Sequence, residues 1–286
     1  LTGGGPAYRG GEMTGPIRLC LLAMATGTVL GGCAYLFDLV PEEKDLPLVA
    51  RPVAEEMLRT LKEREDKVTG LKAMLDLTVW HGGRRQYLHQ VAVAERPALI
   101  RLETIGWGGL TTLVVASDGH RLAAHAPLEN IFFEGTATPE NIAAVAGIQV
   151  APSHLVRLLM GLPPLPIQID KSAIYRRDDE HAFLLRERES SFTQRIWLSE
   201  EDLTLLRGEL YDWRSLRLRF RYSPEGYGLF SLLLEEPRGR VVVEVSYRSY
   251  EMNPELAGEL FRLPRPVGKT RVVNLDAGPV PSLKLP

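Results

Sequence analysis

The chain has 286 residues, of which 34 are lysine or arginine and 36 are aspartate or glutamate, so its formal charge at pH 7 is -2. A nucleic-acid-binding surface needs a clearly basic face, and this balance of charges gives no sign of one. The length is enough for one large domain with a sizeable hydrophobic core, and no second domain is required.

The N-terminal region predicts an export signal. Residues 1–12 lie upstream of the first methionine, Met13, and are rich in glycine, which suggests an over-extended reading frame outside the fold. After Met13, the chain passes from Arg18 through an apolar core to small residues, which is the order of a signal peptide. The apolar run is shorter than the roughly 20 residues that a membrane-spanning helix needs.

The signal ends in Leu-Gly-Gly-Cys at positions 30–33, which resembles the lipobox of bacterial lipoproteins. A lipobox cysteine receives a diacylglyceryl group and becomes the new N-terminus. We therefore predict a lipoprotein signal peptide over 13–32 and lipidation at Cys33; the alternative is a buried cysteine after an uncleaved helix. The only other cysteine, Cys20, leaves with the signal, so the mature chain has no disulfide, thiol nucleophile or cysteine metal site.

Residues 33–52 contain three prolines among mixed charges and are expected to form the lipid anchor and an extended tether. The folded domain is predicted to span 53–286. It begins with an amphipathic helix over 53–68, because apolar residues recur there at helical spacing. These apolar residues are Val53, Met57, Leu58, Leu61 and Val68.

The period then changes to that of short strands separated by glycine and proline, which predicts an antiparallel meander. The expected strands are 71–80, 86–94, 98–105, 110–117 and, after a tight turn at Asp118-Gly119, 121–125. Two short helices follow, one entered through Thr138-Pro139 and continuing over 142–145, the other over 153–161. Strands return at 173–177, 181–188, 194–198, 216–222, 229–235 and 241–247.

The strand at 216–222 shows the clearest alternation in the chain. Arg217, Arg219 and Arg221 alternate with apolar residues, so the arginines are expected on a solvated face and the apolar residues on a dry one. Together the strands predict an α+β fold, mainly antiparallel, whose sheet is curved enough to enclose its apolar face.

The order of elements and three short motifs resemble the LolA/LolB-like lipoprotein-carrier superfamily, including its less characterised outer-membrane branches. The first motif is the Arg-Pro pair that enters the strand at 96–103, and the second is the Asp-Gly hairpin at 115–122. The third is the closing element with Asn253-Pro254 and residues 260–268. The resemblance covers nearly all of the mature chain. It extends to those branches of the superfamily that are known only as domains of unknown function.

This resemblance implies an unclosed β-barrel, with an N-terminal helix and short mid-chain helices covering its mouth, that holds acyl chains in an apolar cavity. It also implies a carrier or receptor rather than an enzyme. The candidate cavity-lining residues are Ile100, Leu102, Leu113, Val115, Leu155, Leu158, Leu159, Leu218, Phe220, Leu232, Leu234, Val243 and Val245. For any one of them an ordinary packed core is the competing interpretation.

The sequence offers no catalytic, metal or cofactor motif. Four histidines lie on two expected hairpins without acidic residues at ligand spacing, and we interpret them as scattered surface residues. The glycine-rich segment 106–109 is not followed by a capped helix, so it is interpreted as a bend, with Trp107 at the rim or in the core. Ser190 and Ser191 lack a nucleophile elbow.

We therefore expect a periplasm-facing lipoprotein that binds lipid or the acyl chains of another lipoprotein, in lipoprotein sorting or outer-membrane biogenesis. The membrane is one partner through Cys33, a protein of an envelope complex is a possible second, and nucleic acid is not expected. Ala34 after the cysteine favours the outer membrane over the inner one. The rival is a structural or assembly lipoprotein with a packed interior; a tethered hydrolase ranks last.

Overall fold

The computed structural model describes residues 46–177, 182–189, 191–213, 215–224 and 230–278. The predicted signal peptide, Cys33 and most of the predicted tether lie outside these residues. The described chain joins the fold earlier than position 53, because the Val49 amide donates to the carbonyl of Ile174 at 2.9 Å and Leu48 pairs with Tyr175. The end of the expected tether is therefore already part of the sheet edge.

A single sheet of 14 strands runs through the described residues, in the spatial order β14-β6-β5-β4-β3-β2-β1-β13-β12-β11-β10-β9-β8-β7. The pairs are antiparallel except for β14 with β6, which is parallel. The strands are β1 (Gly70–His81), β2 (Arg84–Glu95), β3 (Leu99–Ile105), β4 (Thr111–Ser117), β5 (Arg121–Ala126), β6 (Ile131–Thr136), β7 (Ser172–Arg177), β8 (Ala182–Glu189), β9 (Phe192–Ser199), β10 (Leu205–Asp212), β11 (Ser215–Pro224), β12 (Phe230–Glu236), β13 (Val241–Met252) and β14 (Arg271–Asn274). Because β14 and β7 form two separate edges, the predicted unclosed antiparallel fold is confirmed.

In the described part of the chain, three α-helices accompany the sheet: α1 (Arg51–Asp66), α2 (Pro139–Ala146) and α3 (Pro152–Leu159). Each has proline in its first turn, where the missing N–H costs no hydrogen bond. The described residues also form three 3₁₀ turns: η2 (Trp107–Gly109), η4 (Gly258–Phe261) and η5 (Leu275–Ala277). Among the described helices, none combines the length and apolarity needed to cross a membrane.

The long β1–β2 hairpin lies near the middle of the sheet and depends on its two-glycine turn. Gly82 and Gly83 have φ values of 57° and 75°, which a type I′ turn requires at both central positions and which side chains with a Cβ adopt at a cost. The two strands then stay in register from His81 opposite Arg84 to Gly70 opposite Glu95.

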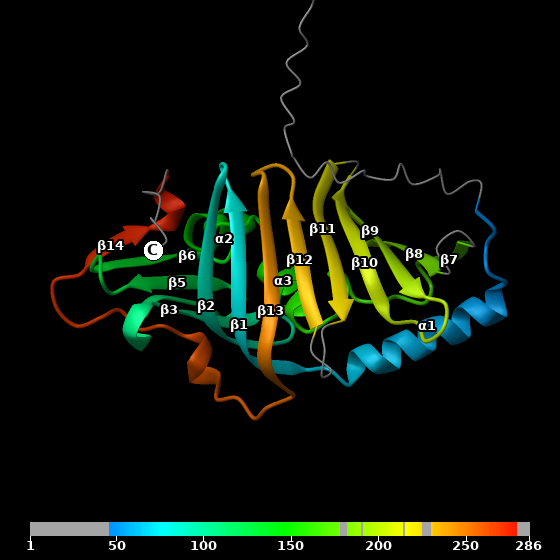
Figure 1. Cartoon of the computed structure of the whole chain (residues 1–286), viewed down its shortest axis with the longest axis horizontal. Helices are drawn as coiled ribbons and strands as arrows, with labels where there is room; N and C mark the ends of the chain where they lie inside the picture. Colours follow the sequence, from blue (N-terminus) through cyan, green and yellow to red (C-terminus); the bar gives the residue numbers. More distant parts are fainter. Residues whose placement is uncertain (1–45, 178–181, 190, 214, 225–229, 279–286) are drawn as a thin grey trace, which may run out of the picture. The chain divides into compact units, whose positions relative to one another are not determined.

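The sheet turns strongly along its width. In Figure 1, β1, β2 and β13 stand upright, whereas β3, β5 and β6 cross the view, because neighbouring strands rotate in a constant hand. One side of this sheet, called here the inner face, carries α2 and α3, which contact β2, β3, β5 and β6. The main hydrophobic core lies between the inner face and these helices.

The opposite side, called here the outer face, is covered over β3 and β4 by the C-terminal segment. Phe261 of η4 is buried there, and β4 is buried on both sides from Thr112 to Ser117. Further along, η5 fixes β6: Asp276 accepts hydrogen bonds from the Thr136 amide and from the Asn141 side chain, the latter at 2.7 Å. Phe261 of the predicted closing element thus packs on the outer face, whereas η5 contacts β6 and α2.

Three strands were not anticipated from the sequence: β6, β10 and β14. The prediction for 216–222 is also wrong at one arginine. Leu218 pairs with Leu210 but Leu216 pairs with Tyr211, so Arg217 is the extra residue of a β-bulge. Its side chain lies in a pocket beside that of Leu218 rather than on the outer face, because a bulge changes the direction of the side chains that it contains.

A buried ion pair joins α1 to α3. Glu65 is 2% exposed, and its two carboxylate oxygens lie 3.2 Å and 3.0 Å from the two terminal nitrogens of Arg157. The Nε of Arg157 donates to the carbonyl of Pro163 at 2.6 Å, and the Ile167 amide donates to Glu65 at 3.1 Å. The pair therefore also holds the chain between α3 and β7.

Burial alone would raise the pKa of Glu65, but the hydrogen bonds and charge of Arg157 outweigh it and hold this pKa below its usual value of 4.5. We predict that Glu65→Gln lowers the free energy of unfolding by about 3–5 kcal/mol, because it leaves the guanidinium buried without its counter-charge. Urea denaturation at pH 7 measures the loss.

The matched control is Glu63→Gln on the exposed side of the same helix, which should change stability by less than about 0.5 kcal/mol. Because the Glu65 pKa is lowered on folding, its stabilisation is present above pH 4.5 and is lost as the pH falls further. The difference between the wild type and Glu65→Gln should therefore shrink in acid. Equal stability of the two at pH 7 would contradict this role for the pair.

Candidate functional site

An apolar cavity of about 70 Å³ lies between the inner face and the two short helices. Its walls come from β1, β2, β3, β4 and β13 on one side and from α2, α3 and the linker between them on the other. The lining residues are Leu75, Leu77, Val79, Leu88, Gln90, Leu102, Leu113, Val115, Val145, Ala146, Ile148, Leu155, Leu159, Val243 and Val245. All but Gln90 are aliphatic.

Strand register brings these side chains together. Every second residue of β1 from Leu75 to Val79 points to the inner face, and β13 places Val245 beside Leu77 and Val243 beside Val79. On the other side of β1, β3 and β4 pair Leu102 with Val115. The cavity wall is thus a continuous aliphatic patch across five strands.

The wall is partly open to solvent at one end. Leu77 and Val79 are half-buried, and so is Gln90, whose side-chain amide donates to the Thr104 hydroxyl at 3.0 Å. This bond satisfies the one polar group of the wall, so the interior keeps its apolar character. A long apolar ligand would have its entry where Leu77 and Val79 are half-buried.

The helix α3 is held to the sheet by its C-terminal carbonyl groups. The Tyr222 hydroxyl donates to the carbonyl of Leu158 at 2.6 Å, and the Tyr247 hydroxyl donates to that of Leu159 at 2.8 Å. Burial raises the pKa of both tyrosines well above the usual range, so both remain donors at any physiological pH. With the Glu65–Arg157 pair, these bonds fix the C-terminal turn of α3.

The helices α2 and α3 and the linker 147–151 between them are called here the helical cover. Its other helix, α2, is attached differently from α3. Thr138 caps α2 by accepting from the Asn141 amide at 3.2 Å, and Asn141 binds the C-terminal segment through Asp276. These contacts hold the start of α2. At its end, Gly147 has a φ of 78°, a left-handed conformation that terminates the helix and begins the linker 147–151. The cavity-lining residues Val145, Ala146 and Ile148 lie around this turn.

Seven of the candidate residues predicted from the sequence lie together in the cavity wall. They are Leu102, Leu113, Val115, Leu155, Leu159, Val243 and Val245. Five others are buried in the core around it: Ile100, Leu158, Phe220, Leu232 and Leu234. Leu218 lines a different pocket, described below.

Sequence reasoning missed the lining residues contributed by β1, by β2 and by the end of α2. The alternation of Leu75, Leu77 and Val79 was a usable signal, because these positions repeat with the period of a strand. The contributions of Val145 and Ile148 had no such signal, since the packing of a short helix onto a distant strand depends on the tertiary fold.

The described residues contain no cluster of three or more histidine, cysteine, aspartate or glutamate side chains that could hold a metal ion.

The β3–β4 loop decides between the two positions that the sequence left open for Trp107, the rim and the core. Trp107 is fully exposed at the tip of η2, with Leu110 two-thirds exposed beside it, so Trp107 is not in the core. It forms an apolar projection on the surface.

The architecture is that of a half-open antiparallel sheet with helices packed on its inner face, and solved structures share it. A DUF1329 family protein from Desulfovibrio piger is similar over 74% of this chain and 96% of its own, with 12% identity and a TM-score of 0.51. This similarity shows a common fold, which is the fold that the predicted resemblance implies.

Two further structures are similar at lower scores. One is a putative outer membrane lipoprotein-sorting protein domain from Vibrio parahaemolyticus, with 13% identity, a TM-score of 0.49 and coverage of 74% of this chain and 97% of its own. The other is a LolA superfamily protein from Nitrosomonas europaea, with 11% identity, a TM-score of 0.46 and coverage of 72% and 97%. No family model matches the sequence, and no curated protein matches it significantly.

Proposed function

We propose that this protein is a periplasm-facing, membrane-anchored lipoprotein that binds lipid, or the acyl chains of other lipoproteins, in the apolar cavity. The observation that carries the proposal is a cavity wall of fourteen aliphatic side chains and one hydrogen-bonded glutamine. Such a wall replaces the interior of a bilayer, and each methylene that it buries contributes about 0.8 kcal/mol. It offers no group for chemistry.

The cavity volume sets a condition on binding. A cavity of roughly 150 Å³ holds one benzene molecule, and the volume here is about 70 Å³. An acyl chain therefore requires the helical cover to move. Because the C-terminal turn of α3 is fixed, we place this movement in the end of α2 and the linker 147–151, which turns at Gly147.

Substitutions at two adjacent positions of β1 test this proposal. Leu77→Glu places a carboxylate at the half-open end of the cavity and is expected to weaken binding of a fluorescent fatty acid by at least about tenfold, because the charge must be desolvated beside the chain. Thr78→Glu changes the neighbouring residue, which is also half-buried but points to the outer face, and should leave the affinity within about twofold.

Circular dichroism and thermal unfolding show whether both variants remain folded. Equal affinity of the two variants would contradict binding in this cavity. If the wild-type protein binds no fatty acid, the rival proposal gains support: a structural or assembly lipoprotein that contacts an envelope-complex protein and has a packed interior. The small cavity volume and the fixed position of α3 are the observations that favour this rival.

Anchoring is the second part of the proposal. Cys33 lies outside the described residues, and its lipidation rests on the lipobox resemblance and the preceding apolar run. We expect the wild-type chain to incorporate radiolabelled palmitate and to fractionate with the outer membrane, the choice that Ala34 favours. Cys33→Ser should abolish the label and release the protein from membranes. Retained label in that variant would exclude Cys33 as the site, and inner-membrane fractionation would correct the choice of membrane.

The exposed β3–β4 loop offers a further membrane contact. An indole ring is favoured at the boundary between headgroups and acyl chains, and Trp107 and Leu110 project together from η2. Trp107→Ala should lower the association of the protein with phospholipid vesicles several-fold in a flotation assay, since it removes most of this projecting apolar surface. Trp213→Ala, at another strongly exposed tryptophan, is the matched control. Equal loss in both variants would argue against a specific role of this loop.

A further inference from the structure

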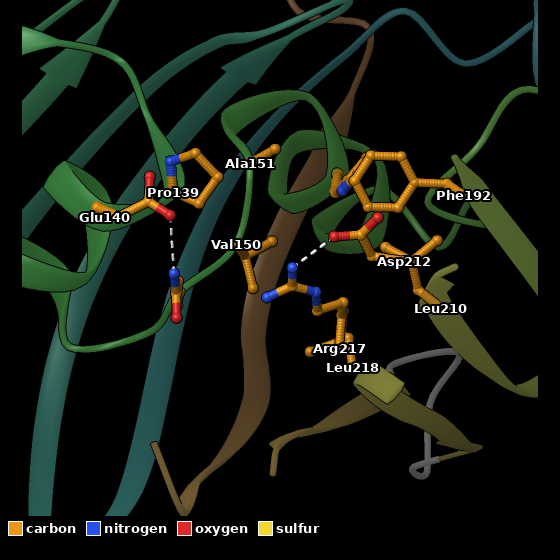
Figure 2. Close-up of a pocket in the computed structure, with 11 residues that line it drawn as sticks. Pro139, Glu140, Val150, Ala151, Phe192, Leu210, Asp212, Arg217 and Leu218 are labelled. Atoms are coloured by element: carbon orange, nitrogen blue, oxygen red, sulfur yellow. Dashed lines mark hydrogen bonds and ion pairs between the residues drawn. The ribbon is translucent and has the colours of Figure 1, made fainter. Parts of the chain in front are cut away.

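A second cavity, called here the polar pocket, lies on the other side of the linker from the apolar cavity. It has a volume of about 240 Å³ and lies between the linker and the ends of β9, β10 and β11 (Figure 2). The two cavities share the linker: Ile148 lines the apolar cavity and Val150 the polar pocket. On α3, Leu155 lines the first and His154 the second.

The bulge in β11 makes this pocket polar. Arg217 would point to the outer face in a regular strand, but as the extra residue it enters the pocket, where it forms an ion pair with Asp212 (Figure 2). Its Nε is buried and has no hydrogen-bond partner among the described residues. A buried donor of this kind is costly unless a ligand or solvent satisfies it.

The start of α3 adds a second positive element. Ala151 at its N-cap has no side-chain bond to the helix, and both Ala151 and His154 line the pocket. The first amide groups of a helix carry partial positive charge and bind anions when no side chain caps them. Burial above all, and then the charge of Arg157, lowers the pKa of His154 to about 4, so His154 is neutral at pH 7.

Two carboxylates give the pocket its negative side. Asp212 is held by Arg217, whose hydrogen bond lowers the pKa of Asp212, and Glu140 accepts from the Gln149 side chain at 2.9 Å. With Arg217 the only cation among the lining residues, the formal charge of the pocket is two negative charges against one positive charge. A purely anionic ligand would gain only the contacts with Arg217 and the start of α3, whereas a ligand with an anionic group and an ammonium group matches both sides.

We propose that the polar pocket binds a zwitterionic phosphoethanolamine-type headgroup whose acyl chain occupies the apolar cavity. This inference rests on the proposed function. The phosphate faces Arg217 and the start of α3, and the ammonium faces Glu140 and Asp212. Movement of the linker that opens the apolar cavity also joins it to the pocket, so that one lipid spans both.

The test uses three single-chain lipids with the same acyl chain: lysophosphatidylethanolamine, lysophosphatidylglycerol and a monoacylglycerol. Calorimetry should rank their affinities in that order, with about fivefold or more between the two phospholipids, because only the first carries the ammonium. In the double variant Glu140→Gln, Asp212→Asn the two phospholipids should bind equally. In Arg217→Met both should fall to the affinity of the monoacylglycerol.

Arg221→Met and Glu244→Gln are the matched controls, because both positions are exposed and point away from the pocket; they should leave the ranking unchanged. Equal affinity of the wild-type protein for all three lipids would overturn the headgroup site and leave the proposed function standing. If none of them binds, the proposed function fails, and glycerophosphoethanolamine then tests the pocket alone. Its binding, lost in Arg217→Met, would support the pocket, and its failure to bind would overturn it.

Discussion

The buried pair of Glu65 and Arg157 is the interaction on which the arrangement around the cavity depends. Two ionised side chains are tolerated in the core because each oxygen of the carboxylate meets a guanidinium nitrogen of Arg157. Lys62 adds a bond to the carboxylate at 3.5 Å, and further bonds go to main-chain groups of Pro163, Leu165 and Ile167. One pair thereby fixes three segments that are distant in sequence. Gln194 of β9 bonds both main-chain groups of Leu165 and extends this fixation to the sheet.

This fixation divides the helical cover into two parts with different freedom. The helix α3 is bound by charged groups on one side and by the hydroxyls of Tyr222 and Tyr247 at its end. The end of α2 instead contributes Val145, Ala146 and Ile148, whose contacts with the sheet are apolar. Dispersion contacts of this kind are short-ranged and can be exchanged for contacts with an acyl chain at little cost, whereas a buried ion pair cannot.

The two faces of the sheet are used for different purposes. The C-terminal segment returns over the outer face of β3 and β4 with Phe261, and β4 is buried on both sides. The inner face remains the variable side, where a modest change in the helical cover creates volume. The proposed binding of long apolar chains requires a sheet that stays in place beside a helical cover that moves, and the polar pocket lies where that cover meets the strand ends.

The sequence by itself determined the fold class and most of the elements. Alternation and turn residues located eleven of the strands, and proline and capping signals located the helices, because these signals are local. The strands β6, β10 and β14 were not predicted, since their apolar content is short or interrupted and their pairing partners decide their conformation. The export signal and Cys33 are likewise local features that the sequence alone predicts.

The tertiary structure decided how these elements form a site. Alternation identified Leu102, Val115 and Val243 as inner-face residues, but whether an inner-face residue lines a cavity or is packed, as Leu232 is, depends on which helix lies above it. The bulge that turns Arg217 into the polar pocket changes one residue of a regular pattern and is set by pairing with β10. The ion pair of Glu65 with Arg157 joins residues that are 92 positions apart. Contacts of this range follow from the three-dimensional packing of the chain, which local periodicity does not record.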